Sequence, residues 1–168
     1  MKIFVFLGFI TFGIYWLVAD DNSLVKASIL DRLYGDKEED AKYLEGRLSV
    51  SENGHKLDVV MLVRLRVWDD CEKVSTNLLS SIIGKCPSCT FDIRECTNTL
   101  SNRYVKLFEN EPSKTTYLSY NAADATERDM RMFTWGLNQD QASMACTMLV
   151  KSTDGHTQNT PVCIGPRN

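Results

Sequence analysis

Residues 57–82 read LDVVMLVRLRVWDDCEKVSTNLLSSI and predict a long β-strand followed directly by an α-helix. In the first half, one face of the strand is apolar at every second position, which is typical of a strand packed against a core. From Cys71 onward the apolar side chains instead recur every three or four positions, and either Asp69 or Asp70 can cap the helix. The alternating strand residues are Leu57, Val59, Met61, Val63, Leu65 and Val67.

The segments on either side of this unit extend it into a complete domain. Asn53-Gly54 suits a tight hairpin turn between strands at 48–50 and 57–68. Further strands are expected at 90–96, 115–120 and 129–136, with a helix at 100–109. A final helix is expected from Asn138, which with Gln141 three residues on forms a variant of a capping box. The sequence thus predicts an α+β fold, a mixed β-sheet with helices packed on it in the order ββαβαββα. No internal repeat is evident.

The N-terminal segment indicates export. Residues 3–19 carry no charge and lie between Lys2 and the pair Asp20-Asp21. A cleaved signal peptide and an uncleaved signal-anchor both fit. The length of the run and the bulky Leu17 near its end favour the anchor, although 17 helical residues fall short of a hydrocarbon core about 30 Å thick.

The expected domain organisation follows from composition. Residues 1–20 form the signal-anchor or signal peptide, and the charged residues 21–46 form a juxtamembrane helix and spacer. Residues 47–152 form the α+β domain, which is disulfide-stabilised. Residues 153–168 are rich in turn formers and are expected to be an irregular tail.

Six cysteines follow the hydrophobic segment, and an even number is typical of an oxidising compartment such as the periplasm or the extracellular space. If the strands before and after the first helix run parallel, Cys71 and Cys96 lie at the same sheet edge, so we expect them to be bonded. A bridge from Cys163 to Cys86 or Cys89 is a second hypothesis. The disulfide candidates are Cys71, Cys86, Cys89, Cys96, Cys146 and Cys163.

Cys86-Pro87-Ser88-Cys89 is the one motif in the sequence that suggests redox chemistry. A redox-active C-x-x-C pair needs a depressed thiol pKa, and its usual source is a helix N-terminus beneath the first cysteine. Here the pair is expected after a helix C-terminus, so structural bridges are the favoured interpretation, with a redox pair second. A zinc site formed with Cys71 and Cys96 is less favoured. We expect no cofactor and no metal.

Few other residues suggest chemistry. His55 and His156 fall in expected turns without a nucleophile or metal motif nearby, so no catalytic residue is assigned. Phe133-Thr134-Trp135-Gly136 is either core or an exposed aromatic platform. Four arginines suggest either a surface of paired charges or a polar sheet face for an anionic ligand. They are Arg64, Arg66, Arg94 and Arg131.

The functional expectation is a non-enzymatic accessory or binding module of the cell envelope. It would be anchored in the membrane by the N-terminal segment, with another envelope protein as a candidate partner. The net charge of −3 and the pI of 5.4 argue against nucleic acid as a ligand. Two alternatives stay open: a thiol-disulfide oxidoreductase that uses Cys86 and Cys89, and a secreted effector-like protein if the segment is cleaved.

Overall fold

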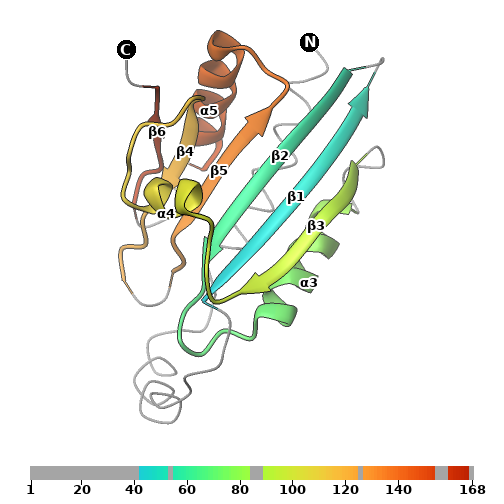
Figure 1. Cartoon of the computed structure of the whole chain (residues 1–168), viewed down its shortest axis with the longest axis vertical. Coiled ribbons are helices and arrows are strands. Elements are labelled where there is room, and N and C mark those ends of the chain that lie inside the picture. Colours follow the sequence, from blue (N-terminus) through green and yellow to red (C-terminus); the bar gives the residue numbers. More distant parts are fainter. Residues whose placement is uncertain (1–41, 53–54, 84–88, 125–126, 154–158, 167–168) are drawn as a thin grey trace.

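The computed structural model describes residues 42–52, 55–83, 89–124, 127–153 and 159–166 (Figure 1). The N-terminal hydrophobic segment, nearly all of the charged spacer, and His156 lie outside the described residues. Within the described ranges, no helix has the length and apolar character needed to cross a membrane.

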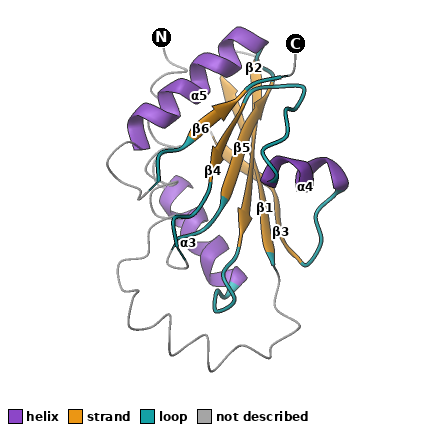
Figure 2. Cartoon of the chain, turned by 90° about the vertical axis from the view of Figure 1, so that its left-hand side faces the viewer, coloured by secondary structure: helices purple, strands orange, loops and turns teal. Residues whose placement is uncertain are grey.

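The described chain alternates strands with helices. The strands form one six-stranded sheet, and the helices pack on its two faces (Figures 1 and 2). In chain order the elements are β1 (Tyr43–Glu52), β2 (His55–Arg64), α3 (Cys71–Ile83), β3 (Cys89–Thr97), α4 (Asn102–Phe108), β4 (Tyr117–Tyr120), β5 (Met130–Trp135), α5 (Gln139–Thr153) and β6 (Val162–Ile164).

The sheet has the strand order β3-β1-β2-β5-β4-β6, and each of its pairings is antiparallel. The expectation of a mixed sheet is therefore wrong, whereas the α+β class is confirmed. β2 and β3 do run parallel to each other, as the sequence suggested, but β1 lies between them and pairs with both. The connection through α3 thus skips one strand, and no parallel pair forms.

The two halves of the sheet have the same topology. In each half a pair of antiparallel strands is followed by a helix and a third strand, which pairs with the outer side of the first strand. The halves meet where β2 pairs with β5, with Met61 opposite Met132. Each half also has a disulfide between its helix and its third strand, Cys71–Cys96 in one and Cys146–Cys163 in the other. The two halves share no pattern of residues that would have revealed this relationship from the sequence.

Each face of the sheet has its own core. α3 and α5 cover one face, and α4 covers part of the other (Figure 2). Successive residues of β2 alternate between the two cores, so Val59 and Met61 pack under α3 and α5 while Val60 and Leu62 pack under α4. The alternation expected from residues 57–68 is confirmed over β2. The core under α4 consists of Val60, Leu62, Leu100, Tyr104, Leu107, Phe108, Tyr117 and Phe133.

Local signals placed the helix starts correctly. Asp70 precedes α3, and its Oδ1 accepts a hydrogen bond from the Lys73 amide at 3.2 Å. The capping box before α5 is also present, because the amides of Gln141 and Asn138 donate to each other's side-chain oxygens at 2.9 and 3.0 Å.

Several boundaries differ from the sequence expectation. The central strand was expected at 57–68, but β2 runs from His55 to Arg64. β1 runs from Tyr43 to Glu52, whereas the first strand was expected only at 48–50 and the domain only from residue 47. The tail at 153–168 was expected to be irregular, but Val162–Ile164 forms β6. β6 pairs with β4 and is bonded through Cys163 to α5, and these long-range contacts leave no local pattern in a stretch dominated by turn formers.

Candidate ligand-binding groove

Four cysteines form two disulfides, each of which joins a helix to a strand. Cys71 is bonded to Cys96, as expected, with their Cα atoms 6.1 Å apart. Cys163 is bonded to Cys146, with a Cα–Cα distance of 5.9 Å, so the hypothesis of a bridge from Cys163 to Cys86 or Cys89 is wrong. Cys89 is disulfide-bonded too, and Cys86 lies outside the described residues.

This arrangement gives little support to thiol chemistry. α3 ends at Ile83 and β3 begins at Cys89, so the C-x-x-C motif follows a helix C-terminus. That end of the helix dipole is negative and disfavours a thiolate. Cys71 and Cys96 are bonded to each other and so do not provide thiolate ligands for zinc. In the ranges that the structure describes, no group of three His, Cys, Asp or Glu side chains is placed to hold a metal ion.

The four candidate arginines do not share one face. Arg64 and Arg131 both lie on the α4 side, where their guanidinium carbons are each 4.8 Å from the centre of the Phe108 ring. Arg94 lies on the opposite side, paired with Glu72 of α3. Arg66 follows the end of β2 and is buried in a separate ion cluster.

That cluster is built around Asp69, whose side chain is 3% exposed. The carboxylate accepts hydrogen bonds from the guanidinium groups of Arg66 and Arg128, at 2.7 Å from each. Burial raises the pKa of Asp69, but the hydrogen bonds and charges of the two arginines outweigh it and hold the pKa below its ordinary value. Asp69 therefore ties the β2–α3 connection to the start of β5 as a buried carboxylate.

Arg131 is completely buried and has a structural role. Its guanidinium donates to the carbonyl oxygens of Leu107 at 2.7 Å and of Phe108 at 3.1 Å, at the C-terminal end of α4. It also donates to the carbonyl of Tyr120 and to the side chain of Asn121, both at 2.6 Å. Burial lowers the pKa of Arg131 to about 10. Arg131 thus holds α4 against β4 and β5 and is not accessible to a ligand.

The C-terminus of α4 is further fixed by the chain itself. Asn110 has φ +58°, and its amide donates to Leu107 while that of Glu111 donates to Lys106, both at 3.1 Å. This is the Schellman arrangement, in which a left-handed residue ends the helix. The Asn110 side chain accepts a hydrogen bond from Ser119 of β4 at 2.6 Å. α4 and the loop that follows it are therefore held in place by both the main chain and the sheet.

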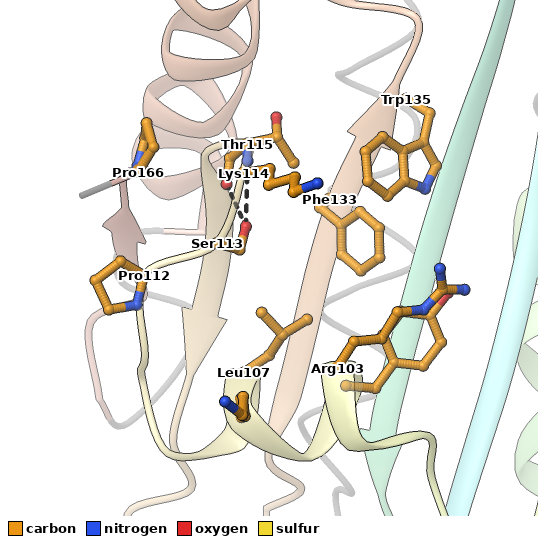
Figure 3. Close-up of a pocket in the computed structure, with 11 residues that line it drawn as sticks. Arg103, Leu107, Pro112, Ser113, Lys114, Thr115, Phe133, Trp135 and Pro166 are labelled. Atoms are coloured by element: carbon orange, nitrogen blue, oxygen red, sulfur yellow. Dashed lines mark hydrogen bonds between the residues drawn. The ribbon is translucent and has the colours of Figure 1, made fainter. Parts of the chain in front are cut away.

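Beside α4 lies a groove with a volume of about 710 Å³ (Figure 3). Its floor is aromatic, with Tyr104 and Phe133 almost fully buried and their ring centres 5.8 Å apart. Trp135 stands next to Phe133 with its ring nearly perpendicular, at 5.3 Å, and is 40% exposed. Trp135 and the alternate residue Phe133 lie on the same side of β5, so the strand presents both rings to the groove.

The rim of the groove is basic. Arg103 and Lys106 of α4 and Lys114 of the following loop all contribute to the lining, and all three are exposed. None of the described residues that line the groove carries a carboxylate. The Arg103 guanidinium lies over the Tyr104 ring, 4.6 Å from its centre, and donates to the Tyr104 hydroxyl at 3.0 Å. Lys106 has a loose contact of 3.8 Å with Glu111, a solvent-exposed pair of the kind that contributes little.

The loop that closes the groove is locally ordered. The Ser113 hydroxyl donates to the carbonyl of Thr115 at 2.6 Å and accepts from the Thr115 amide at 3.3 Å. This turn places Lys114 at the rim (Figure 3). Pro166, just after β6, lies on the same side and lines the groove with Pro112.

The sequence identified only one part of this groove in advance, the stretch from Phe133 to Gly136. The three rim cations were not singled out. Arg103 and Lys106 flank the inward Tyr104 in a short amphipathic helix, but any solvated helix face has this pattern. Comparisons with models of protein families, with curated proteins and with solved structures found no match to this chain.

Proposed function

We propose that this protein is a non-enzymatic binding module of the cell envelope, held at the membrane by its N-terminal hydrophobic segment. In this proposal the groove beside α4 is the ligand site. The observation that carries the proposal is the combination of an aromatic floor with a rim of three cations, without a carboxylate among the described residues of the lining. Concave sites with an apolar lining and a few polar groups are where proteins usually bind ligands.

The disulfides support the location. Cys71–Cys96 and Cys146–Cys163 suit an oxidising environment such as the periplasm or the extracellular space. Attachment to the membrane rests on residues 3–19 of the sequence. The groove itself favours binding over catalysis, because the lining residues that the structure describes offer lysine, arginine and hydroxyl groups but no pair suited to acid-base or nucleophilic chemistry.

Binding of small aromatic probes tests whether the groove is a ligand site. The full chain in detergent micelles is titrated with benzyl alcohol, phenylacetate and benzylammonium, and amide shifts are followed by NMR. Saturable shifts confined to Lys106, Ser113, Trp135 and their neighbours are expected, and they should vanish in Trp135→Ala. Val67→Ala is the matched control, because Val67 is also exposed and lies outside the groove. Shifts scattered over the surface, or centred on the exposed Met144 and Met148 of α5, would contradict the proposal.

A further inference from the structure

Resting on the proposed function, we infer that the groove binds an acidic peptide segment of a partner protein. In this segment an aromatic or large aliphatic anchor residue carries carboxylate side chains on both sides. The anchor packs on the floor at Phe133, and the flanking carboxylates meet Arg103 and Lys114.

The distribution of charge around the groove indicates the sign of the ligand's charge. The whole chain has 22 acidic and 19 basic residues, so its net charge is −3. The groove lining departs from this balance, since it contains three cations and, among the described residues, no acid. Two acidic side chains outside the lining interact with its cations. Glu111 has the loose contact with Lys106, and Glu45 interacts with Arg103, although burial and then Glu95 raise the pKa of Glu45 by more than Arg103 lowers it. A negatively charged ligand is complementary to such a rim, and this complementarity governs specificity and association rate.

The geometry gives the order of groups along the ligand. Arg103 and Lys114 lie on opposite sides of the Phe133 ring (Figure 3). In an extended peptide, neighbouring side chains point in opposite directions. When one side chain points down to the floor, the side chains before and after it point away from the floor, where the long side chains of Arg103 and Lys114 can reach them. An anchor flanked by two acids therefore places each part of the peptide against the matching part of the groove.

The floor and one cation of the rim, Arg103, are also organised before binding. Phe133 and Tyr104 are buried in the core under α4, and Arg103 is already stacked on the Tyr104 ring. Trp135 is held against Phe133 in an edge contact. A site whose groups are already in position loses less conformational entropy when the ligand arrives. The volume of about 710 Å³ falls within the range of known ligand sites.

Single-stranded nucleic acid is the competing class, because it also combines negative charge with flat rings. Its affinity comes from many phosphate contacts along a basic track. The groove provides three cations and the protein is acidic as a whole, so a short acidic peptide fits the observations better.

Three short peptides test the inference by NMR titration of the full chain, with the Trp135 indole N–H as the reporter. They are acetyl-Gly-Asp-Phe-Asp-Gly-amide, its neutral counterpart with Asn for both Asp, and its counterpart with Ala for Phe. The first should bind about tenfold more tightly than either of the others, and a tenfold change corresponds to about 1.4 kcal/mol. Its advantage over the neutral peptide should shrink when salt is raised from 150 to 500 mM, because the added salt shortens the Debye length and screens the attraction between exposed charges.

A matched pair of charge reversals locates the effect. Lys114→Glu should abolish the preference for the acidic peptide. Lys73→Glu makes the same change in charge at an exposed site outside the groove, on α3, and should preserve the preference. Equal affinity for the acidic and neutral peptides, or tighter binding of an eight-residue oligothymidylate at Trp135, would overturn the inference. The proposed function would still stand in either case if the small aromatic probes bind in the groove, and it fails separately if they do not.

Discussion

Arg131 and Leu107 are joined by a hydrogen bond of 2.7 Å, in which the completely buried guanidinium of β5 donates to the last turn of α4. The same guanidinium also reaches Phe108 and β4. A cation at a helix C-terminus complements the partial negative charge there. This contact links the sheet to the helix that forms one wall of the groove.

Replacing Arg131 by Met should therefore lower the free energy of unfolding by about 2–4 kcal/mol, since several buried carbonyl groups lose their donor. Arg64→Met is the control, because its guanidinium also lies 4.8 Å from the Phe108 ring centre but is 46% exposed and paired with Asp129. It should cost less than about 1 kcal/mol. Chemical denaturation measures both. Equal losses in the two variants would show that the buried hydrogen bonds of Arg131 carry no particular weight.

The buried carboxylate of Asp69 should make the stability of the protein depend on pH in the acid range. Its pKa is held below the ordinary value of 3.8 in the folded protein, so its contribution to stability is complete above that pH. As the pH falls below about 3.8, the unfolded chain takes up the proton first, and the contribution is progressively lost. The melting temperature of the wild type should therefore fall as the pH is lowered below about 3.8.

Asp69→Asn should be about 3–5 kcal/mol less stable at pH 7, because Arg66 and Arg128 are left buried without their shared carboxylate. The variant should also lose less stability than the wild type between pH 5 and 3. Asp70→Asn is the control, because Asp70 is exposed and an asparagine retains the helix cap. A pH profile of Asp69→Asn parallel to that of the wild type would assign the acid sensitivity to other groups.

The structure predicts the complete pairing of the six cysteines. Cys71, Cys96, Cys146 and Cys163 are bonded in two pairs, and Cys89 is also bonded, which leaves Cys86 as its expected partner among the six cysteines. Peptide mapping without reductant should recover Cys71–Cys96, Cys146–Cys163 and Cys86–Cys89. A linked peptide of any other composition would contradict this pattern.

Intact-mass analysis of the same sample decides between an anchored and a secreted protein. A full-length mass with no alkylatable thiol is the result expected of an anchored module. A mass that lacks about the first twenty residues would instead indicate a cleaved signal peptide. Rapid alkylation of Cys86 or Cys89 after mild reduction, with the other two bridges intact, would support the oxidoreductase alternative.

Sequence reasoning succeeded where the determinants are local. The alternation in β2, the cap at Asp70 and the pair Asn138 and Gln141 each act within a few residues, and each appears in the structure as expected. The Cys71–Cys96 bridge was also accessible, because it follows from the direction of two strands.

What the sequence could not supply depends on contacts between distant segments. The insertion of β1 between β2 and β3 makes the sheet antiparallel, and nothing local specifies it. Arg131 looked like a surface charge, yet it satisfies main-chain carbonyls at the end of α4. The groove brings together α4, a loop, β5 and the residue Pro166, so its basic rim is visible only once the chain is folded.

The conformation of Gly136 suggests that the shape of the groove depends on the backbone at the end of β5. The residue follows Trp135 directly, has φ +91°, and a Cβ atom there would lie 2.7 Å from the Lys56 carbonyl oxygen. Both the dihedral angle and the contact exclude a side chain, so Gly136→Ala must shift the end of β5. The expected loss of stability is about 1–3 kcal/mol. Gly46→Ala is the control, because a Cβ there meets its nearest neighbour, the Met61 side chain, at 3.7 Å, an ordinary contact.

The two glycine variants also separate a local effect on the groove from a general loss of stability. Gly136→Ala should weaken the binding of phenylacetate and move the Trp135 indole signal. The contact between Trp135 and Phe133 requires the present backbone conformation at the end of β5. Gly46 lies in the middle of β1, away from the groove lining, so Gly46→Ala should leave both readouts unchanged. Unaltered probe binding in a folded Gly136→Ala variant would mean that the position of Trp135 does not depend on the glycine turn.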